Sequence, residues 1–221
     1  IVNEVMSKCR PLEFFSDYIK QGYYPFGTEG FALYHQRVEN IVDMLLNIEL
    51  PQLRSVDIGN IRKIKALLAI ISTEVPKLVD ITKLATLTGI ARTTMLAYLQ
   101  YLHEAKLIRL LYSDDLSVKK MQKPDKILME NTNLLQALSL QVPNIGTMRE
   151  TFFCNQLGYT HQVEYNKRGD YLIDHKYVFE IGGKAKDGKQ VANMENAYIA
   201  SDECDYPIGN KLPLWLFGLM Y

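Results

Sequence analysis

Apolar residues recur at helical spacing through the first third of the chain. Three segments place them on one helical face: 12–19, which follows Pro11, 38–46, which Pro51 ends or kinks, and 61–73, which Pro76 ends. Proline fits the first turn of a helix and disrupts its interior, so these prolines mark helix boundaries or bends. We therefore expect the first unit of the chain to be helical.

Residues 80–108 have the pattern of a helix-turn-helix. Asp80 is suited to cap the first helix, because its carboxylate can accept a free N–H of the first turn. Gly89 tolerates the positive φ that a tight turn between two helices needs. Residues 107–112 then read as the first strand of a wing, so this segment predicts a winged helix.

The winged-helix pattern also indicates which residues would meet DNA. The second helix, about 92–105, buries its apolar face and leaves polar residues at its exposed start, which is the part of such a helix that enters the major groove. Basic residues in the wing suit phosphate contacts. The candidate DNA-binding residues are Arg92, Thr93, Thr94, Lys119 and Lys120. Winged helices also dock proteins, and that alternative stays open.

The hydrophobic period changes in the last unit from helical to strand-like. One helix is expected at about 147–157, and the following short segments alternate apolar and polar residues between turn residues. The predicted order is a helix, three strands, a short helical stretch and a fourth strand, with the strands at 162–165, 170–173, 177–181 and 197–200. This order predicts an α+β domain.

Composition and charge add a functional expectation. The 221 residues are 48% hydrophobic and 23% charged, as in an ordinary globular protein. Net charge is zero but unevenly spread: −3 over 1–60 (5 basic, 8 acidic), +5 over 61–145 (12 basic, 7 acidic) and −2 over 146–221 (8 basic, 10 acidic). The basic middle favours a polyanion such as DNA as partner. Ordinary solvated lysines are the alternative.

Other patterns narrow the class of protein. No apolar run approaches the roughly 18 residues that span a bilayer, so we expect no membrane partner. Cys9, Cys154 and Cys204 lie far apart without metal-ligand spacing, which is typical of free thiols in the cytoplasm. No G-x-x-x-x-G-K-[ST] phosphate loop occurs, so we expect no ATPase activity from this chain. The sequence leaves the oligomeric state open.

Acidic residues in the last unit could form one site. A three-residue turn at Asp174 would pair residue 173 with residue 177, and therefore Asp170 with Glu180 on the same face. Glu150 on the preceding helix would add a third carboxylate near this pair. Asp170 and Glu180 could hold Mg²⁺ through their carboxylate oxygens. Lys184 could orient the attacking water or stabilise a developing phosphate charge. Solvated acids at strand ends, with Lys184 a loop lysine, are the alternative.

Seven segments together resemble the C-terminal half of a family of uncharacterised prokaryotic AAA-type ATPases, common in Bacteroidetes and archaea. They are GYYPF (22–26), KLATLTGIARTTMLAYLQYLHEAKLIRLLYS (83–113), ENTNLL (130–135), NIGTMRETFFCNQL (144–157), GDYLID (169–174), FEIGGK (179–184) and GNKLPLWLFG (209–218). The resemblance implies a helical lid remnant at 1–60, a winged helix at 61–143 and a restriction-endonuclease-like domain of αβββαβ order, similar to PD-(D/E)XK nucleases, at 144–221.

The resemblance also implies residue roles. On the nuclease pattern, Asp170 matches the first acid, Glu180 the second and Glu150 the helix acid, all three catalytic together with a lysine. The pattern places that lysine two residues after the second acid, where this chain has Gly182, so Lys184 would have to reach in from the strand end. ATP would bind a separate N-terminal domain of the same protein. The expected function is DNA binding with Mg²⁺-dependent phosphodiester hydrolysis, and the alternative is a non-catalytic protein-interaction or regulatory module.

Overall fold

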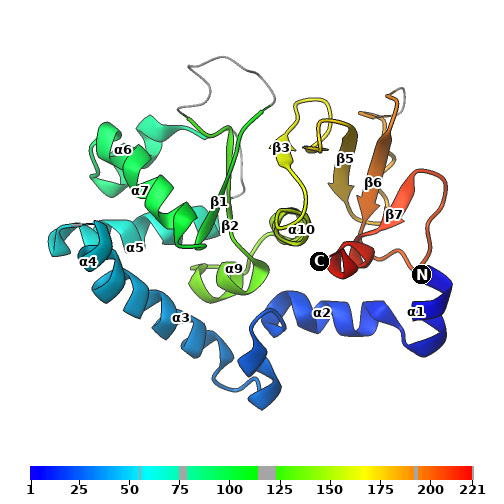
Figure 1. Ribbon diagram of the computed structural model, residues 1–221, viewed down its shortest axis with the longest axis horizontal. Coiled ribbons are helices and arrows are strands. Elements are labelled where there is room, and N and C mark those ends of the chain that lie inside the picture. Colours follow the sequence, from blue (N-terminus) through cyan, green and yellow to red (C-terminus); the bar gives the residue numbers. More distant parts are fainter. Residues whose placement is uncertain (55, 75–78, 114–122, 192–193, 221) are drawn as a thin grey trace.

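The chain folds into helices and two small β-sheets, a mixed α+β architecture. The structure, a computed structural model, describes residues 1–54, 56–74, 79–113, 123–191 and 194–220. The sheets have two and five strands. Figure 1 shows the helices of the first half along one side, the smaller sheet above them and the larger sheet at the far end of the molecule. No helix among the described residues is long and apolar enough to cross a membrane.

The first part of the chain is helical, as its spacing predicts. Its helices are α1 (Val2–Lys8), α2 (Pro11–Gln21), α3 (Tyr34–Met44), α4 (Leu50–Arg54) and α5 (Ile58–Thr73), with a 3₁₀ turn at Pro25–Glu29. Pro11 occupies the first turn of α2. Pro51 does not end its helix: α3 leads through a π-helical turn, Leu45–Glu49, directly into α4, which contains Pro51. A π-helical turn is one of the irregularities by which a helix bends, so it can accommodate the proline.

The predicted helix-turn-helix is present. Asp80 accepts hydrogen bonds from the N–H groups of Thr82 and Lys83 at the start of α6 (Ile81–Thr88), and Gly89 ends that helix with a left-handed φ of 65°. Helix α7 (Arg92–Glu104) follows at once. The remaining elements of this part are the antiparallel strands β1 (Ile108–Leu111) and β2 (Lys126–Met129) and the helix α9 (Thr132–Leu138).

The last part of the chain packs one long helix on a five-stranded sheet. Helix α10 (Ile145–Leu157) precedes strands in the spatial order β3-β4-β5-β6-β7, of which β3 to β5 are antiparallel and β5 to β7 parallel. The strands are β3 (Val163–Tyr165), β4 (Tyr171–Ile173), β5 (Tyr177–Gly182), β6 (Ala197–Ser201) and β7 (Lys211–Pro213).

Two features of this sheet differ from the sequence prediction. The short helical stretch expected between β5 and β6 is absent from the described residues there, which form turns, because glycines such as Gly188 (φ 66°) break helical continuity. Strand β7 was not predicted, and it is followed by a 3₁₀ helix, Leu214–Leu219, that buries Trp215.

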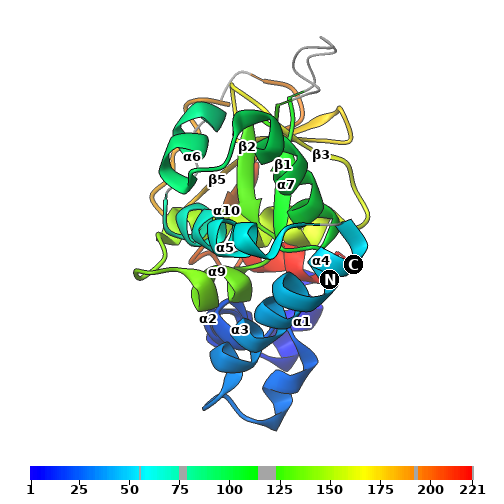
Figure 2. The same ribbon diagram turned by 90° about the vertical axis from the view of Figure 1, so that its left-hand side faces the viewer.

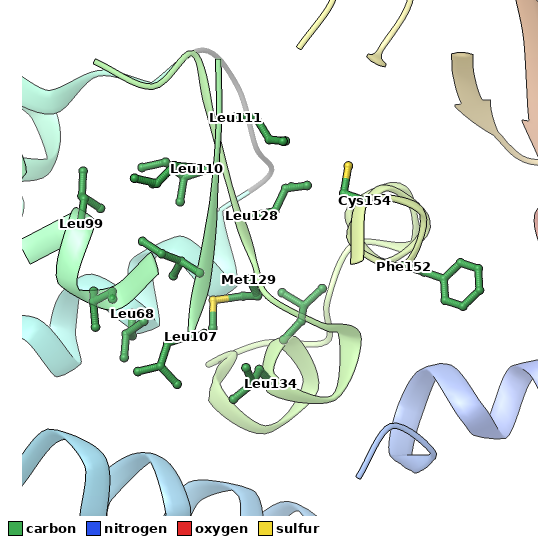
Figure 3. Packing of buried hydrophobic residues seen from close by; sticks show 14 of the residues in the cluster. Leu68, Leu99, Leu107, Leu110, Leu111, Leu128, Met129, Leu134, Phe152 and Cys154 are labelled. Carbon is green, nitrogen blue, oxygen red and sulfur yellow. The ribbon is translucent and has the colours of Figure 1, made fainter. Parts of the chain in front are cut away.

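Helix α10 lies between the two sheets, and the core is continuous across it. Strands β1 and β2 are buried on both faces. Figure 3 shows Leu110 pointing toward α7, whereas Leu111 and Leu128 point toward Cys154 on α10. Phe152, on another side of α10, packs edge to face against Phe15 of α2, with the ring centroids 4.8 Å apart. The packing of α10 therefore joins all parts of the chain.

One buried asparagine ties the N-terminal helices to the rest. Figures 1 and 2 both place α9 between these helices and the remainder of the molecule. At the start of α9, the amide nitrogen of Asn133 donates to the carbonyls of Tyr18 (3.2 Å) and Ile19 (3.1 Å). Its amide oxygen accepts from the N–H of Tyr23 (2.9 Å) and from the hydroxyl of Tyr34. The GYYPF and ENTNLL segments thus meet at this residue.

Replacing Asn133 with leucine, which has a similar shape, removes all of these hydrogen bonds while keeping the volume. A buried polar group that loses its partner costs about 1–3 kcal/mol, so we expect Asn133→Leu to lower the free energy of unfolding by about 3 kcal/mol or more. Urea denaturation at pH 7 measures this change. The control is Asn47→Leu on the exposed surface, expected to change stability by less than about 0.5 kcal/mol; equal losses in the two variants would contradict the anchoring of α2 by Asn133.

Candidate functional site

The site forms around the first half of α10. Residues 150, 154 and 158 follow each other at intervals of four, so they share the face of α10 that meets β1 and β2. Cys154 lies in the middle of this face and is fully buried, which raises the pKa of its thiol to about 12. This thiol is therefore inert packing. The polar chemistry lies at the two ends of the face.

Glu150 lies at the end of this face that is closer to the start of α10. Its Oε2 accepts a hydrogen bond from the Nζ of Lys126 on β2 and another, of 2.5 Å, from the hydroxyl of Tyr171 on β4. The ammonium of Lys126 also lies 5.1 Å from the centre of the Tyr171 ring, within cation–π range. Glu150 is therefore held by residues from two different sheets.

Asp170 lies beside strand β5, which carries Glu180, and the hairpin has the predicted register. Residue Ile173 pairs with Tyr177, as predicted from the turn length. Just before β4, the N–H of Asp170 donates to the carbonyl of Phe179 (2.8 Å), and its carboxylate Oδ2 accepts the N–H of Ile181 at 2.6 Å. The Asp170 carboxylate is thus bound to the residue next to Glu180.

The lysine at the site is Lys186, from the loop after β5. Its Nζ lies 2.8 Å from Oε1 of Glu180, whose side chain is 2% exposed. This hydrogen bond raises the pKa of Lys186, so its ammonium stays charged at neutral pH. The other oxygen of Glu180, Oε2, is buried and has no hydrogen bond to the described residues. An unpaired buried carboxylate oxygen is costly, and it is the kind of group that a cation would satisfy.

Gly182 leaves room for this lysine. A Cβ built at Gly182 would lie 2.8 Å from both Cβ and Cγ of Lys186, closer than such atoms approach. The alkyl chain of Lys186 therefore runs across the position where the nuclease pattern has its own lysine. Lys184, the lysine expected from the sequence, is exposed instead, and its carbonyl accepts a hydrogen bond from Lys211 (2.7 Å). The structure brings Lys186, not Lys184, to Glu180.

Asp170 and Glu180 suit a divalent cation such as Mg²⁺. Both offer carboxylate oxygens, the ligands that Mg²⁺ prefers, and Oε2 of Glu180 is buried without a partner among the described residues. Within the described part of the chain, no three His, Cys, Asp or Glu side chains are grouped to hold a metal ion. A cation held by these two acids would keep several waters, as Mg²⁺ usually does.

The predicted DNA-binding residues are separate from the carboxylates in sequence and element. Arg92 and Thr93 are exposed at the start of α7, and Thr94 is half-buried. Lys119 and Lys120 lie outside the described residues, so their expected place in a wing is untested. The start of α7 therefore presents one cation and hydroxyl groups to solvent.

Both lysines of the site were missed by the sequence reasoning, as was Tyr171. Lys126 falls in the basic middle of the chain, and only its position in β2 indicates that it shares a face with the buried Leu128. Lys186 lies six residues after Glu180, and no spacing rule predicts how the intervening loop returns. The two consecutive glycines, Gly182 and Gly183, were the available signal for a close approach at that point.

Comparison with known proteins identifies one family. A family model described as "Domain of unknown function (DUF8612)" matches residues 12–144. The match ends one residue before α10 begins, so it includes Lys126 and excludes Glu150. Neither the curated proteins nor the solved structures include a significant match to the chain.

The ionised carboxylate of Asp170 should cost stability. Burial raises the pKa of Asp170, and the neighbouring Glu150 adds to this, whereas the N–H of Ile181 opposes it. The folded protein thus holds this proton more tightly than the unfolded chain. The contribution of Asp170 to stability is full below its unfolded pKa and is lost as pH rises through its folded pKa.

We therefore expect Asp170→Asn to stabilise the protein at pH 7, by about 0.5–2 kcal/mol, the usual range for relief of such costs. The asparagine oxygen can still accept the N–H of Ile181. Urea denaturation at pH 7 and pH 4 measures the change, which should shrink at pH 4 as the wild-type carboxyl takes up its proton. Asp17→Asn, at an exposed position of α2, is the control, and we expect it to give no gain in stability. A loss of stability in Asp170→Asn at pH 7 would contradict the assignment.

Proposed function

The chain belongs to the DUF8612 family, and from the geometry of its carboxylate site we propose that it binds DNA and hydrolyses phosphodiester bonds with Mg²⁺. In this proposal it is the nucleic-acid-facing C-terminal region of an AAA-type ATPase, and ATP binds an N-terminal domain of the same protein. The observation that carries the proposal is Glu180, a buried acid with Lys186 on one oxygen and no partner among the described residues on the other.

Element order supports the same proposal. Helices α6 and α7 followed by β1 and β2 have the order of a winged helix, and α10 followed by β3 to β5 has the order of the first half of a restriction-endonuclease-like domain. The absence of a helix between β5 and β6 in the described residues departs from the complete αβββαβ order. The site itself lies within the α10, β4 and β5 portion, where the order agrees.

Each residue of the site has a distinct part in hydrolysis. Asp170 and Glu180 would hold Mg²⁺, which supplies Lewis-acid stabilisation of phosphate charge when bound. Lys186 keeps its ammonium beside Glu180 and can orient the attacking water or stabilise charge on the phosphate. Glu150, fixed by Lys126 and Tyr171, adds negative charge near Asp170 and favours a cation there. The exposed start of α7 would bind the DNA backbone.

DNA cleavage by the intact chain tests the proposal, because the proposal predicts different effects for substitutions of Lys186 and Lys184. We expect Lys186→Met to reduce Mg²⁺-dependent cleavage of plasmid DNA by at least about 100-fold, the usual effect of removing one charge-stabilising group. Lys184→Met, a change of the same kind two residues away on the exposed loop, should retain wild-type cleavage. The measurement is the rate of nicking of supercoiled DNA with and without Mg²⁺.

Asp170→Asn/Glu180→Gln, purified in parallel, separates the protein's own activity from a contaminant. Equal cleavage by this variant and the wild type would assign the activity to contamination. Absence of cleavage by the wild type, with no Mn²⁺ or Mg²⁺ binding in a titration, would overturn the nuclease proposal in favour of a non-catalytic interaction or regulatory module.

DNA binding has its own test at the start of α7. A phosphate contact by Arg92 contributes through counterion release, so Arg92→Ala should weaken duplex binding and lower the salt slope of log Kd by about 1. Fluorescence anisotropy at several salt concentrations measures both. Arg10→Ala, an exposed arginine of the acidic first unit, is the matched control. An unchanged affinity and slope in Arg92→Ala would remove α7 from the DNA interface.

A further inference from the structure

Lys126 is a buried cation that reaches the carboxylate site from outside it. Its side chain is 8% exposed, and it is the first residue of β2, in the part of the chain that the family model matches. Its partners Glu150 and Tyr171 lie on α10 and β4, beyond that match. Every other side chain of the site belongs to residues 150–186, so Lys126 is the contribution of a separate unit.

Strand alternation fixes where Lys126 points. Lys126 is paired with Leu111 across the β1–β2 ladder, and both side chains share a face with Leu128. Figure 3 shows the side chains of Leu111 and Leu128 pointing toward Cys154 on α10. A lysine at the start of β2 therefore faces the residue one helical turn before Cys154, which is Glu150.

The β1–β2 hairpin is also attached to the larger sheet directly. The N–H of Tyr165 on β3 donates to the carbonyl of Tyr112 at 2.9 Å, and Ser113 forms a parallel bridge with Tyr165. The N–H of Ser113 in turn donates to Oδ2 of Asp125, the neighbour of Lys126 (2.8 Å). These contacts set the distance between β2 and α10 at the end where Lys126 lies.

Stability alone is a poor explanation for this pair. Taking a lysine and a glutamate out of water costs several kcal/mol for each ion, and replacement of such a pair by apolar side chains is often neutral or stabilising. The nearest neighbours of Lys126 on this face, Leu111 and Leu128, are buried and apolar, so an apolar pair would fit beside them. The charges are explained better by the site that they enter.

We propose that Lys126 is a positioning residue of the carboxylate site: from β2 it fixes the carboxylate of Glu150 and the ring of Tyr171, so that the site is complete only while the β1–β2 hairpin is docked on α10. The chemistry of the site in this inference rests on the proposed function. The link between Lys126 and Glu150 does not, because it can be observed in the protein without metal or DNA.

The experiment compares four variants of the whole 221-residue chain with the wild type. Lys126→Met removes the charge and keeps the length, Lys126→Arg keeps the charge, and Lys126→Met/Glu150→Gln removes both charges of the pair. Lys167→Met, an exposed lysine before β4, is the control. The metal-free readout is the ¹³C NMR signal of the Glu150 side-chain carboxyl, assigned as the signal present in Lys126→Met and absent from the double variant. The second readout is kcat and KM for Mg²⁺-dependent DNA cleavage.

We expect the Glu150 signal to shift in Lys126→Met, to return toward its wild-type position in Lys126→Arg and to stay unchanged in Lys167→Met. The kcat should fall about 10–100-fold in Lys126→Met, as is usual when a residue that orients the groups of a site is removed. The KM should stay within about threefold, and Lys126→Arg should recover part of the lost kcat. The double variant should be at least as stable as Lys126→Met in urea, yet as slow, which separates positioning from folding.

Two results would overturn the inference. An unchanged Glu150 signal in Lys126→Met would show that the lysine does not hold the carboxylate. An unchanged kcat in Lys126→Met, while Lys186→Met is inactive, would show that the contact has no effect on the site. If the wild type does not cleave DNA, the proposed function fails. The Glu150 signal alone then decides whether Lys126 fixes the carboxylate of Glu150.

Discussion

The burial of α10 is the constraint on which the structure depends. Residues 151–157 are all buried, so this half of the helix has no solvent face on which to place polar groups. Polar side chains directed into this space need partners, since unpaired buried polar groups are costly, although the hydroxyls of Thr147 and Thr151 have none among the described residues. The composition of β1, β2 and β4 around α10 reflects this requirement, and the carboxylate site is one of its results.

The two ends of α10 meet the requirement in different ways. At the far end, Gly158 leaves space for the guanidinium of Arg109, which pairs with Glu130 at 2.5 Å beneath the ring of Tyr159. Tyr159 closes this pair by donating to Glu130 (3.2 Å). At the near end, Glu150 is bound by Lys126 beside further acids and beside Lys186. At each end one carboxylate oxygen, Oε2 of Glu130 or Oε2 of Glu180, is buried without a hydrogen bond to the described residues. The two ends differ because only the near end has further acids and a second lysine beside the pair.

Local sequence signals predicted those features that depend on neighbouring residues. The cap at Asp80, the left-handed turn at Gly89 and the pairing of Ile173 with Tyr177 each follow from side-chain chemistry or from turn length within a few residues. Strand β7 was missed because it has only three residues and contains a proline. Lys126 and Lys186 could not be placed, because their positions depend on how β2 docks on α10 and on the path of a glycine-containing loop.

The close approach of Lys186 to Gly182 links the evolutionary histories of the two positions. A side chain at residue 182 would overlap the alkyl chain of Lys186, so a lysine cannot be gained there while Lys186 keeps its place against Glu180. Loss of Lys186 first would leave Glu180 without its cation, and gain at 182 first would displace the cation already present. A chain that exchanges one arrangement for the other without leaving Glu180 unpaired must therefore change both residues together.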